Sequence, residues 1–498
     1  MAATEIEERH SGLSRQRIGL LLGAVLFAFI LLSEPPAGLS GAGWRAAAVV
    51  VLMATWWLTE ALPVFATGLL PLALFPLLNV VDIGTAAAPY ANPLIFLFMG
   101  GFMIALAMQR WGLHTRIALA LLSITGTRAR NLVGGFMIST ALLSMWVSNT
   151  ATTMMMLPIA LSVLALLKAD SLEDQKLPGF NTALVLAVAY GANVGGLATL
   201  VGTPPNALLA AYFDETYGVN IGFSDWMMVG LPISTVLLFL TWLLLTRIFY
   251  PMPNTHVDGV AAILDTARSK LGPVSHGERM VAIAFASAAF LWVFRPILTD
   301  LFPWLRLSDA GIAIFIALSL FIIPSRKRIG DGVLNWEWAS RLPWGVLLIF
   351  GGGLSLAGAA EASGLSDWIG TAMAGWGGIP ALILLLAIVT AVVFLTEVTS
   401  NTATTAMLLP LLATAAVATG ENPLTFCVPA ALAASCAFML PSGTPPNAIV
   451  FGSGQVTIPQ MARAGFWLNL VSIFVLVAAS YTLTEQIFGM LPGVLSGG

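Results

Sequence analysis

Long apolar stretches separated by short polar connections run through most of the chain. A helix that crosses a bilayer needs about 20 mainly apolar residues. About eleven spans are predicted on this basis, at 18–33, 44–61, 63–80, 93–109, 181–212, 226–249, 278–297, 308–323, 343–360, 425–451 and 464–488. The pattern therefore predicts an all-α polytopic membrane protein.

Two further apolar stretches, 131–167 and 378–419, are too long for one span. Each contains a polar Ser-Asn-Thr cluster near its middle. Polar clusters at membrane depth are tolerated only where they face protein, water or ligand. We therefore expect two re-entrant helical hairpins, each of which returns to the side of the membrane from which it started.

The distribution of Lys and Arg supports the two hairpins. With re-entrant hairpins and a cytoplasmic N-terminus, 18 of the 21 basic residues lie inside, and only Arg45, Arg295 and Arg306 lie outside. Counting the hairpins as ordinary spans scatters the basic residues over both sides. The count predicts a multi-pass membrane protein with its N-terminus in the cytoplasm and its C-terminus outside. It also predicts that the apolar, arginine-flanked segment 111–130 is an amphipathic helix in the cytoplasmic interface.

Composition narrows the class of protein further. Only 9% of the residues are charged and 58% are hydrophobic, whereas soluble proteins are about 25% charged. The absence of a basic stripe excludes nucleic-acid binding. The scattered histidines, Cys427 and Cys436 form no metal-ligand or nucleophile pattern. We therefore expect neither an enzyme nor an organic cofactor.

The two halves of the chain repeat each other. Ser148–Ala160 and Ser400–Leu412 share nine of thirteen positions, and the sequence GTPPNA occurs at both Gly202–Ala207 and Gly443–Ala448. Each half contains five expected spans. Because this number is odd, the second copy has the opposite orientation in the membrane. Inverted-topology repeats are typical of secondary transporters, which bind substrate and ions near the midplane at the repeat interface.

The repeated motifs carry chemistry suited to ions. Ser-Asn-Thr residues suit the start of a helix, whose free N–H groups favour an anion. The two prolines of GTPPNA force the chain out of helix, and the carbonyls so exposed suit a cation such as sodium. No Lys, Arg or His occurs in 131–167, 178–246 or 376–462. The countercharge for a bound anion must then come from helix N-termini and from cations, which predicts coupled binding.

Several readings remain open from the residues alone. Glu397 is the only acid in the second hairpin, and it could couple protons or cations or could be a hydrogen-bonded structural acid. An anion channel can also contain duplicated broken helices, although a carrier is favoured. A membrane-embedded enzyme would need a nucleophile–base pair or metal ligands, which the motifs lack.

Together, the paired SNT motifs, the paired GTPPN loops and the segment WWLTEALP resemble the divalent anion/sodium symporter family. The resemblance implies a homodimer in the lipid bilayer, with a scaffold domain and an elevator-type transport domain in each protomer. The implied division is 1–17 cytoplasmic segment, 18–130 first scaffold part, 131–249 first transport part with an unwound helix at 202–207, 250–277 cytoplasmic linker, 278–377 second scaffold part, and 378–498 second transport part with an unwound helix at 443–448.

The resemblance also implies which residues bind. A first sodium site would use Ser144, Ser148, Asn149 and the backbone of Gly202, and a second Thr396, Thr399, Asn401 and the backbone of Gly443. The implied substrate contacts are Ser148, Asn149, Thr150, Thr203, Ser400, Asn401, Thr402, Thr444 and Pro445. The implied activity is symport of about two sodium ions with a C4-dicarboxylate such as succinate, malate or fumarate. Citrate or sulfate as substrate, proton coupling and exchange transport are the alternatives.

Overall fold

The computed structural model describes residues 2–169, 177, 179–253, 255–257, 259–326, 331–373 and 378–488. These residues form helices and connections, with two isolated β-bridges and no named strand among them. The first half comprises α1 (Ala2–Leu32), α2 (Gly41–Thr59), α3 (Val64–Thr67), α4 (Leu70–Leu77), α5 (Ile83–Ala87), the 3-10 turn η1 (Ala88–Ala91), α6 (Pro93–Trp111), α7 (Leu113–Thr125), α8 (Ala129–Ser144), α9 (Asn149–Ala169), α11 (Phe180–Gly196), α12 (Pro204–Tyr217), α13 (Phe223–Leu243) and the π-helical η2 (Leu244–Phe249).

The second half has the same succession of long and broken helices. It comprises α14 (Val260–Lys270), α15 (His276–Leu301), α16 (Asp309–Ile322), α17 (Trp336–Ala339), α18 (Trp344–Ala362), α19 (Leu365–Met373), α20 (Ala381–Leu395), α21 (Asn401–Ala418), α22 (Pro423–Ala433), α23 (Pro445–Gly452), α24 (Ile458–Ala479), the π-helical η4 (Ser480–Thr484) and α25 (Glu485–Phe488). The all-helical class predicted from the sequence is confirmed.

Eight helical segments among the described residues are long and apolar enough to cross a membrane. Three of the spans expected from the sequence are instead pairs of shorter helices: α3 with α4, α11 with α12, and α22 with α23. In the last two pairs the second helix begins at the prolines of a GTPPNA motif, as their missing N–H donors require. The number of eleven crossings stays a prediction.

Both expected hairpins contain a helix break at their polar cluster. Helix α8 ends at Ser144 and α9 begins at Asn149, while α20 ends at Leu395 and α21 begins at Asn401. Helices α8 and α9 pack against each other and on α11, whereas α20 and α21 both pack on α22. The two broken segments are therefore each built around the helix that leads into a GTPPNA loop.

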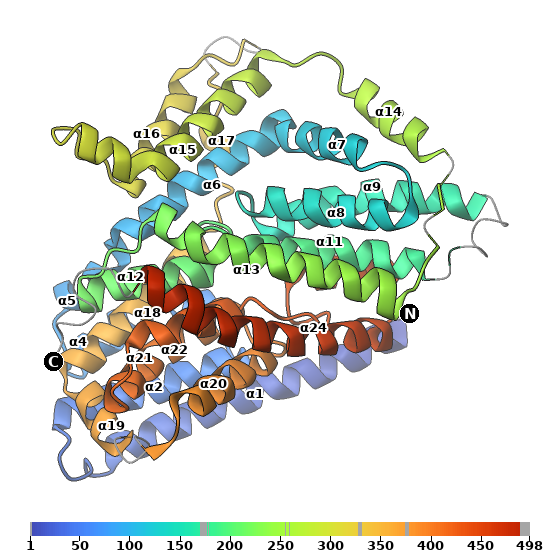
Figure 1. Cartoon of the computed structure of the whole chain (residues 1–498). Coiled ribbons are helices and arrows are strands. Elements are labelled where there is room, and N and C mark those ends of the chain that lie inside the picture. The colour runs from blue at the N-terminus through green and yellow to red at the C-terminus, as the bar shows by residue number, and fades with distance from the viewer. Residues whose placement is uncertain are drawn as a thin grey trace.

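The repeat seen in the sequence is also present in space. Helices α13 and α24, which occupy equivalent places in the two halves, lie side by side (Figure 1). The rings of Phe98 and Phe350, equivalent positions of α6 and α18, have centroids 5.2 Å apart. Equivalent residues that contact each other must lie close to a local two-fold axis. That axis therefore passes through the centre of the molecule, between the two halves.

Small residues bring the first hairpin close to the helix beneath it. A Cβ atom on Gly195 of α11 would lie 2.4 Å from the carbonyl oxygen of Ala141 on α8. Close backbone approach at small residues is the usual basis of helix packing in membranes, where no hydrophobic force drives helices together. The packing fixes the end of α8 against the part of α11 that precedes the first GTPPNA loop.

Two amphipathic helices follow equivalent membrane helices. Helix α7 follows α6 after Gly112, and α19 follows α18 after Gly364, and both glycines have positive φ values, 73° and 76°. Glycine adopts this left-handed conformation without a steric cost, which permits the sharp change of direction. The interfacial position expected for 111–130 stays a prediction.

Some residues named in the sequence analysis lie outside the described residues. These are 489–498, with the C-terminus that we expect outside the cell, and the basic residues Lys176, Lys327 and Arg328.

Candidate functional site

The first hairpin tip and the first GTPPNA loop converge on one cluster of oxygen atoms. The Ser144 hydroxyl, at the end of α8, donates to Asn149 Oδ1, at the start of α9, over 2.5 Å. A Cβ atom on Gly196 would lie 2.8 Å from that same Oδ1 and 3.2 Å from the carbonyl oxygen of Gly202. Three of the residues implied for the first sodium site are therefore close together: Ser144, Asn149 and Gly202.

Two polar side chains fix the unwound segment between α11 and α12. The Asn206 amide donates to the carbonyl oxygens of Gly196, Leu197 and Thr199 over 3.1, 3.3 and 2.8 Å. The Thr199 hydroxyl donates to the carbonyl oxygen of Met145 at the hairpin tip over 2.5 Å. The loop and the tip are thus tied to each other, so the carbonyls near the oxygen cluster cannot move independently.

The second hairpin builds a related cluster. The Thr396 hydroxyl lies 2.6 Å from Asn401 Oδ1 and 2.7 Å from the carbonyl oxygen of Ala434, at the end of α22. This arrangement repeats the Ser144–Asn149 pair of the first half. The Thr399 hydroxyl instead contacts the Leu395 carbonyl and the Thr404 hydroxyl, both 2.8 Å away within the hairpin. The structure therefore does not bring the Thr399 hydroxyl into the Thr396–Asn401 cluster.

Glu397 supports the second unwound segment. One carboxylate oxygen accepts the N–H groups of Phe438 and Met439 and the Asn469 amide over 2.7, 2.9 and 2.8 Å, and the other accepts the N–H of Leu440 over 3.0 Å. The glutamate is only 3% exposed. These contacts give the carboxylate the role of a buried acceptor for a non-helical stretch of backbone.

The same carboxylate lies beside the second GTPPNA loop. A Cβ atom on Gly443 would lie 2.8 Å from Glu397 Oε2, so only glycine fits there without displacement. Asn447, the counterpart of Asn206, donates to the carbonyl oxygens of Ala437 and Leu440 over 3.1 and 3.0 Å. The sequence offset of the hairpins places Met145 opposite Glu397, so the first half has no equivalent charge.

The threonines of the two GTPPNA loops bond across the repeat. The Thr203 hydroxyl lies 3.2 Å from the Ser435 hydroxyl of the second half, and Asn193 of the first half donates to the Thr444 hydroxyl over 3.0 Å. Both threonines are 4% exposed. Their hydroxyls therefore join the two halves in this conformation, while their contact with a substrate stays a prediction, as does that of Pro445.

The starts of α9 and α21 present accessible polar groups between these clusters. Ser148, Asn149, Thr150, Ser400 and Asn401 are half-buried, whereas Thr402 is buried. Ser148 Oγ accepts the N–H of Ala151 over 3.4 Å, a long contact, and Ser400 makes no side-chain cap bond. The first-turn N–H groups of both helices are thus largely uncommitted, as a site for an anion requires.

One basic residue reaches the second hairpin from a distant part of the chain. Arg15 of α1 donates to the carbonyl oxygens of Leu58 and Val398 over 2.7 and 3.0 Å. Val398 lies in the break between α20 and α21. The sequence does not predict this contact of the Arg15 guanidinium. Arg15 and Val398 are about 380 positions apart, and no periodic pattern links α1 to the second hairpin.

The donor set of both clusters suits a hard monovalent cation. No group of three or more His, Cys, Asp or Glu side chains occurs among the described residues. The available ligands are hydroxyl, amide and carbonyl oxygens, which sodium and other hard cations prefer over nitrogen and sulfur. The oxygen donors of the two clusters therefore suit a transported sodium ion, and they do not suit a transition-metal ion, which prefers nitrogen or sulfur ligands.

Comparison with known proteins supports this picture. Residues 14–489 match the family described as the sodium:sulfate symporter transmembrane region. The chain belongs to this family. The resemblance of the SNT and GTPPN motifs to the divalent anion/sodium symporters is thereby confirmed. Family membership covers both hairpins, both unwound loops and the helices around them.

Individual known proteins are similar to this chain over almost their full length. The sodium-dependent dicarboxylate transporter SdcS of Staphylococcus saprophyticus is 44% identical, over 95% of this chain and 92% of its own. SdcS of Staphylococcus aureus is 42% identical over the same shares. The crystal structure of the Alcanivorax borkumensis YdaH transporter is similar in fold, with a TM-score of 0.53, 16% identity, and coverage of 96% of this chain and 98% of that one.

The Glu397 contacts lead to a prediction. Glu397→Gln replaces an acceptor oxygen by an NH2 group that faces backbone N–H donors, so the variant should lose about 1–3 kcal/mol of stability. The loss of a charge beside Gly443 should also weaken apparent sodium affinity. Thermal unfolding in detergent, with and without sodium, measures both effects. Glu361→Gln, at an exposed glutamate of α18, is the matched control, and equal behaviour of the two variants would contradict the role given to Glu397.

Proposed function

We propose that this protein is a secondary active transporter that couples sodium to the uptake of C4-dicarboxylates such as succinate, malate and fumarate. The observation that carries the proposal is the pairing of two repeat-related oxygen clusters with two open helix N-termini. Relatives that are 42–44% identical over nearly the full chain bear the name sodium-dependent dicarboxylate transporter. The scaffold, the homodimer and the elevator movement implied by the family resemblance are part of the proposal.

Charge balance explains why the two ligands bind together. A helix N-terminus contributes roughly half a positive charge, so α9 and α21 together offset only about half of a dicarboxylate's charge. Basic residues are absent from both hairpins and both GTPPNA segments, and Arg15 reaches only the edge of the second tip. Sodium at the Ser144–Asn149 and Thr396–Asn401 clusters supplies the remainder. The anion and the cations therefore stabilise each other in the site.

Proton coupling through Glu397 is less well supported. The four groups that contact its carboxylate all donate hydrogen bonds to it. A proton on this carboxylate would meet donors on every side and would find no acceptor among these partners. Glu397 thus acts as a hydrogen-bond acceptor that supports the backbone of residues 438–440. Citrate, sulfate and exchange transport remain the competing versions of the proposal, and they differ from it in substrate or in coupling.

Transport itself is tested in proteoliposomes. Labelled succinate should accumulate with an inward sodium gradient and not with choline, and excess malate or fumarate should compete more strongly than citrate or sulfate. Asn149→Ala and Asn401→Ala should each abolish uptake, because each removes an oxygen from a tip cluster without a change in core volume. Asn220→Ala, at an exposed asparagine, should transport normally. Uptake in choline equal to that in sodium would refute the coupling.

The two sodium clusters are tested separately from the substrate site. Ser144→Ala and Thr396→Ala each remove one ligand oxygen, so apparent sodium affinity should fall about tenfold or more, as expected for a lost bond to a charged group. Succinate affinity at saturating sodium should change less. Ser123→Ala, at an exposed serine of α7, serves as the control. If both site variants kept the sodium dependence of the wild type, the assignment of two sodium sites would fail.

An elevator movement requires contacts that can separate between the two implied domains. Trp146 at the first hairpin tip and Phe223 at the start of α13 pack against Trp292 of α15: the Phe223 and Trp292 rings stack at 4.9 Å, and Trp146 lies 6.4 Å from Trp292. The Phe223 N–H also donates to Asp309 over 3.0 Å, and Asp309 pairs with Arg295 over 2.8 Å. This small aromatic and polar contact joins the implied transport domain to the implied scaffold.

Fixing that contact should stop transport without loss of binding. In a background without Cys427 and Cys436, the pair Phe223→Cys and Trp292→Cys should be joined by a short bifunctional thiol reagent. Uptake should then fall to background, and sodium-dependent succinate binding should persist, because the site itself is intact. Each single-cysteine variant treated with the same reagent is the control. Full uptake by the cross-linked protein would exclude movement at this contact.

A further inference from the structure

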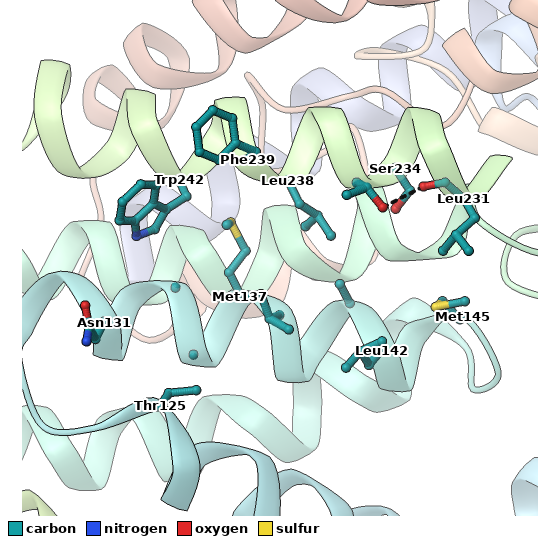
Figure 2. Close-up of a pocket in the computed structure, with 15 residues that line it drawn as sticks. Thr125, Asn131, Met137, Leu142, Met145, Leu231, Ser234, Leu238, Phe239 and Trp242 are labelled. Carbon is teal, nitrogen blue, oxygen red and sulfur yellow. Dashed lines mark hydrogen bonds between the residues drawn. The ribbon is translucent and has the colours of Figure 1, made fainter. Parts of the chain in front are cut away.

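A long apolar groove lies between α8 and α13, on the outer side of the first hairpin. It encloses about 550 Å³, and its walls are almost entirely hydrophobic. Figure 2 shows Asn131 and Trp242 at one end and Met145 and Leu231 at the other. Glycines 134 and 135 lie on the α8 wall, where a Cβ atom would lie 3.1 Å from the Trp242 indole nitrogen and 2.3 Å from the Thr125 hydroxyl oxygen, respectively. The volume lies within the range of about 300–1,000 Å³ typical of ligand pockets.

The groove is open to the surroundings of the protein. Ile138 and Leu142 on one wall and Phe239 on the other are 47%, 42% and 58% exposed. Phe239 belongs to the segment Phe223–Phe249, which is long and apolar enough to cross a membrane, so hydrocarbon is the expected surrounding of the groove. From Asn131 to Met145 the groove follows 14 residues of helix, about 21 Å at the usual rise of 1.5 Å per residue. One bilayer leaflet contributes about 15 Å of hydrocarbon, so the groove can take an acyl chain over the full depth of a leaflet.

The charged residues near the groove lie at one of its ends. Arg128, the extended N-cap residue of α8, lies three positions before Asn131 in the sequence, and Arg247 lies in η2, five positions after Trp242 of the other wall. Both arginines are exposed. No acidic residue occurs in 111–145 or 226–250, the segments that supply the walls and their ends. The Trp242 indole N–H donates to the Arg130 carbonyl over 3.0 Å, as suits an aromatic residue at the membrane surface.

We infer that this groove binds an anionic phospholipid, with one acyl chain between α8 and α13 and the phosphate at Arg128 and Arg247. An occupant with one long apolar tail and one anionic end matches both the length and the one-sided charge. Basic pockets between membrane helices are a known mode of headgroup recognition. The tail end reaches Met145, whose carbonyl accepts the Thr199 hydroxyl, so the lipid touches the back of the first hairpin tip. The inference does not depend on which anion is transported.

Lipid binding is measured on the purified, delipidated full-length protein. Phosphatidylglycerol and phosphatidylcholine with the same chains are titrated, with retained lipid counted by native mass spectrometry and stability followed by thermal shift. Phosphatidylglycerol should bind more tightly. The double variant Arg128→Gln/Arg247→Gln should reduce its affinity about ten- to thirty-fold, the factor expected for two arginines near an anionic headgroup. Arg268→Gln, at an exposed arginine of α14, should not.

A second variant tests the binding site of the acyl chain. It leaves the net charge of the protein unchanged, so its effect cannot come from a change in overall electrostatics. Ile138→Trp places a ring in the groove and should reduce the affinity of both lipids. Val236→Trp, at a 46% exposed position of α13 outside the groove, should leave both unchanged. Equal binding of the two lipids by wild type and all variants would overturn the inference. The inference would also be overturned if Ile138→Trp lost the ability to form a dimer while its lipid binding stayed unchanged. That result would mean that a second copy of the chain, and not a lipid, covers the groove.

Discussion

The need to hydrogen-bond every backbone group inside a bilayer dominates this structure. Each helix break at membrane depth frees N–H and carbonyl groups that have no water to bind, and each unsatisfied group costs several kcal/mol. Asn206 and Asn447 satisfy carbonyls of the two unwound segments, and Glu397 satisfies three N–H groups of the second. These side chains fix the direction of the remaining free carbonyls. Sodium binding at the proposed clusters would depend on that direction, since a cation ligand must be in place before the ion loses its water.

The repeat is closely symmetric in sequence and unequal in charge. Both hairpins pair a hydroxyl with an asparagine oxygen, Ser144 with Asn149 and Thr396 with Asn401, at nearly the same distance. The second half has an acidic side chain, Glu397, beside its loop, and the equivalent position of the first half is Met145. In a low-dielectric interior a full charge this close has a large effect on a neighbouring ion. Two sodium sites built on these clusters would therefore differ in affinity despite their shared origin.

The sequence predicts those features whose cause is local. Polar residues and paired prolines inside apolar stretches mark the helix breaks, and the duplicated motifs mark the equivalent positions. The grouping of Ser144 with Asn149, and of Thr396 with Asn401, comes from the family resemblance, and the structure places the members of each pair in contact. The contacts of Asn193 with Thr444, Asn469 with Glu397, and Arg15 with Val398 are not predicted, because each partner lies at least 70 positions away and no periodicity links the two. Three stretches expected to be single spans are pairs of helices, and hydropathy does not show this for a related reason. Hydropathy reports only how apolar a stretch is. The hydrogen bonds that stabilise a break within it come from residues elsewhere in the fold.

The first hairpin tip joins three parts of the molecule within five residues. Met145 binds the first unwound loop through Thr199 and forms the inner end of the apolar groove, and Trp146 stacks near Trp292 of α15. Asn149 contributes to the oxygen cluster. Because these residues share one short non-helical segment, an ion that orders Asn149 also restricts the position of Trp146. Under the proposed function, binding at the site and packing between the implied domains would be linked through the backbone of the tip, without a longer path through the protein.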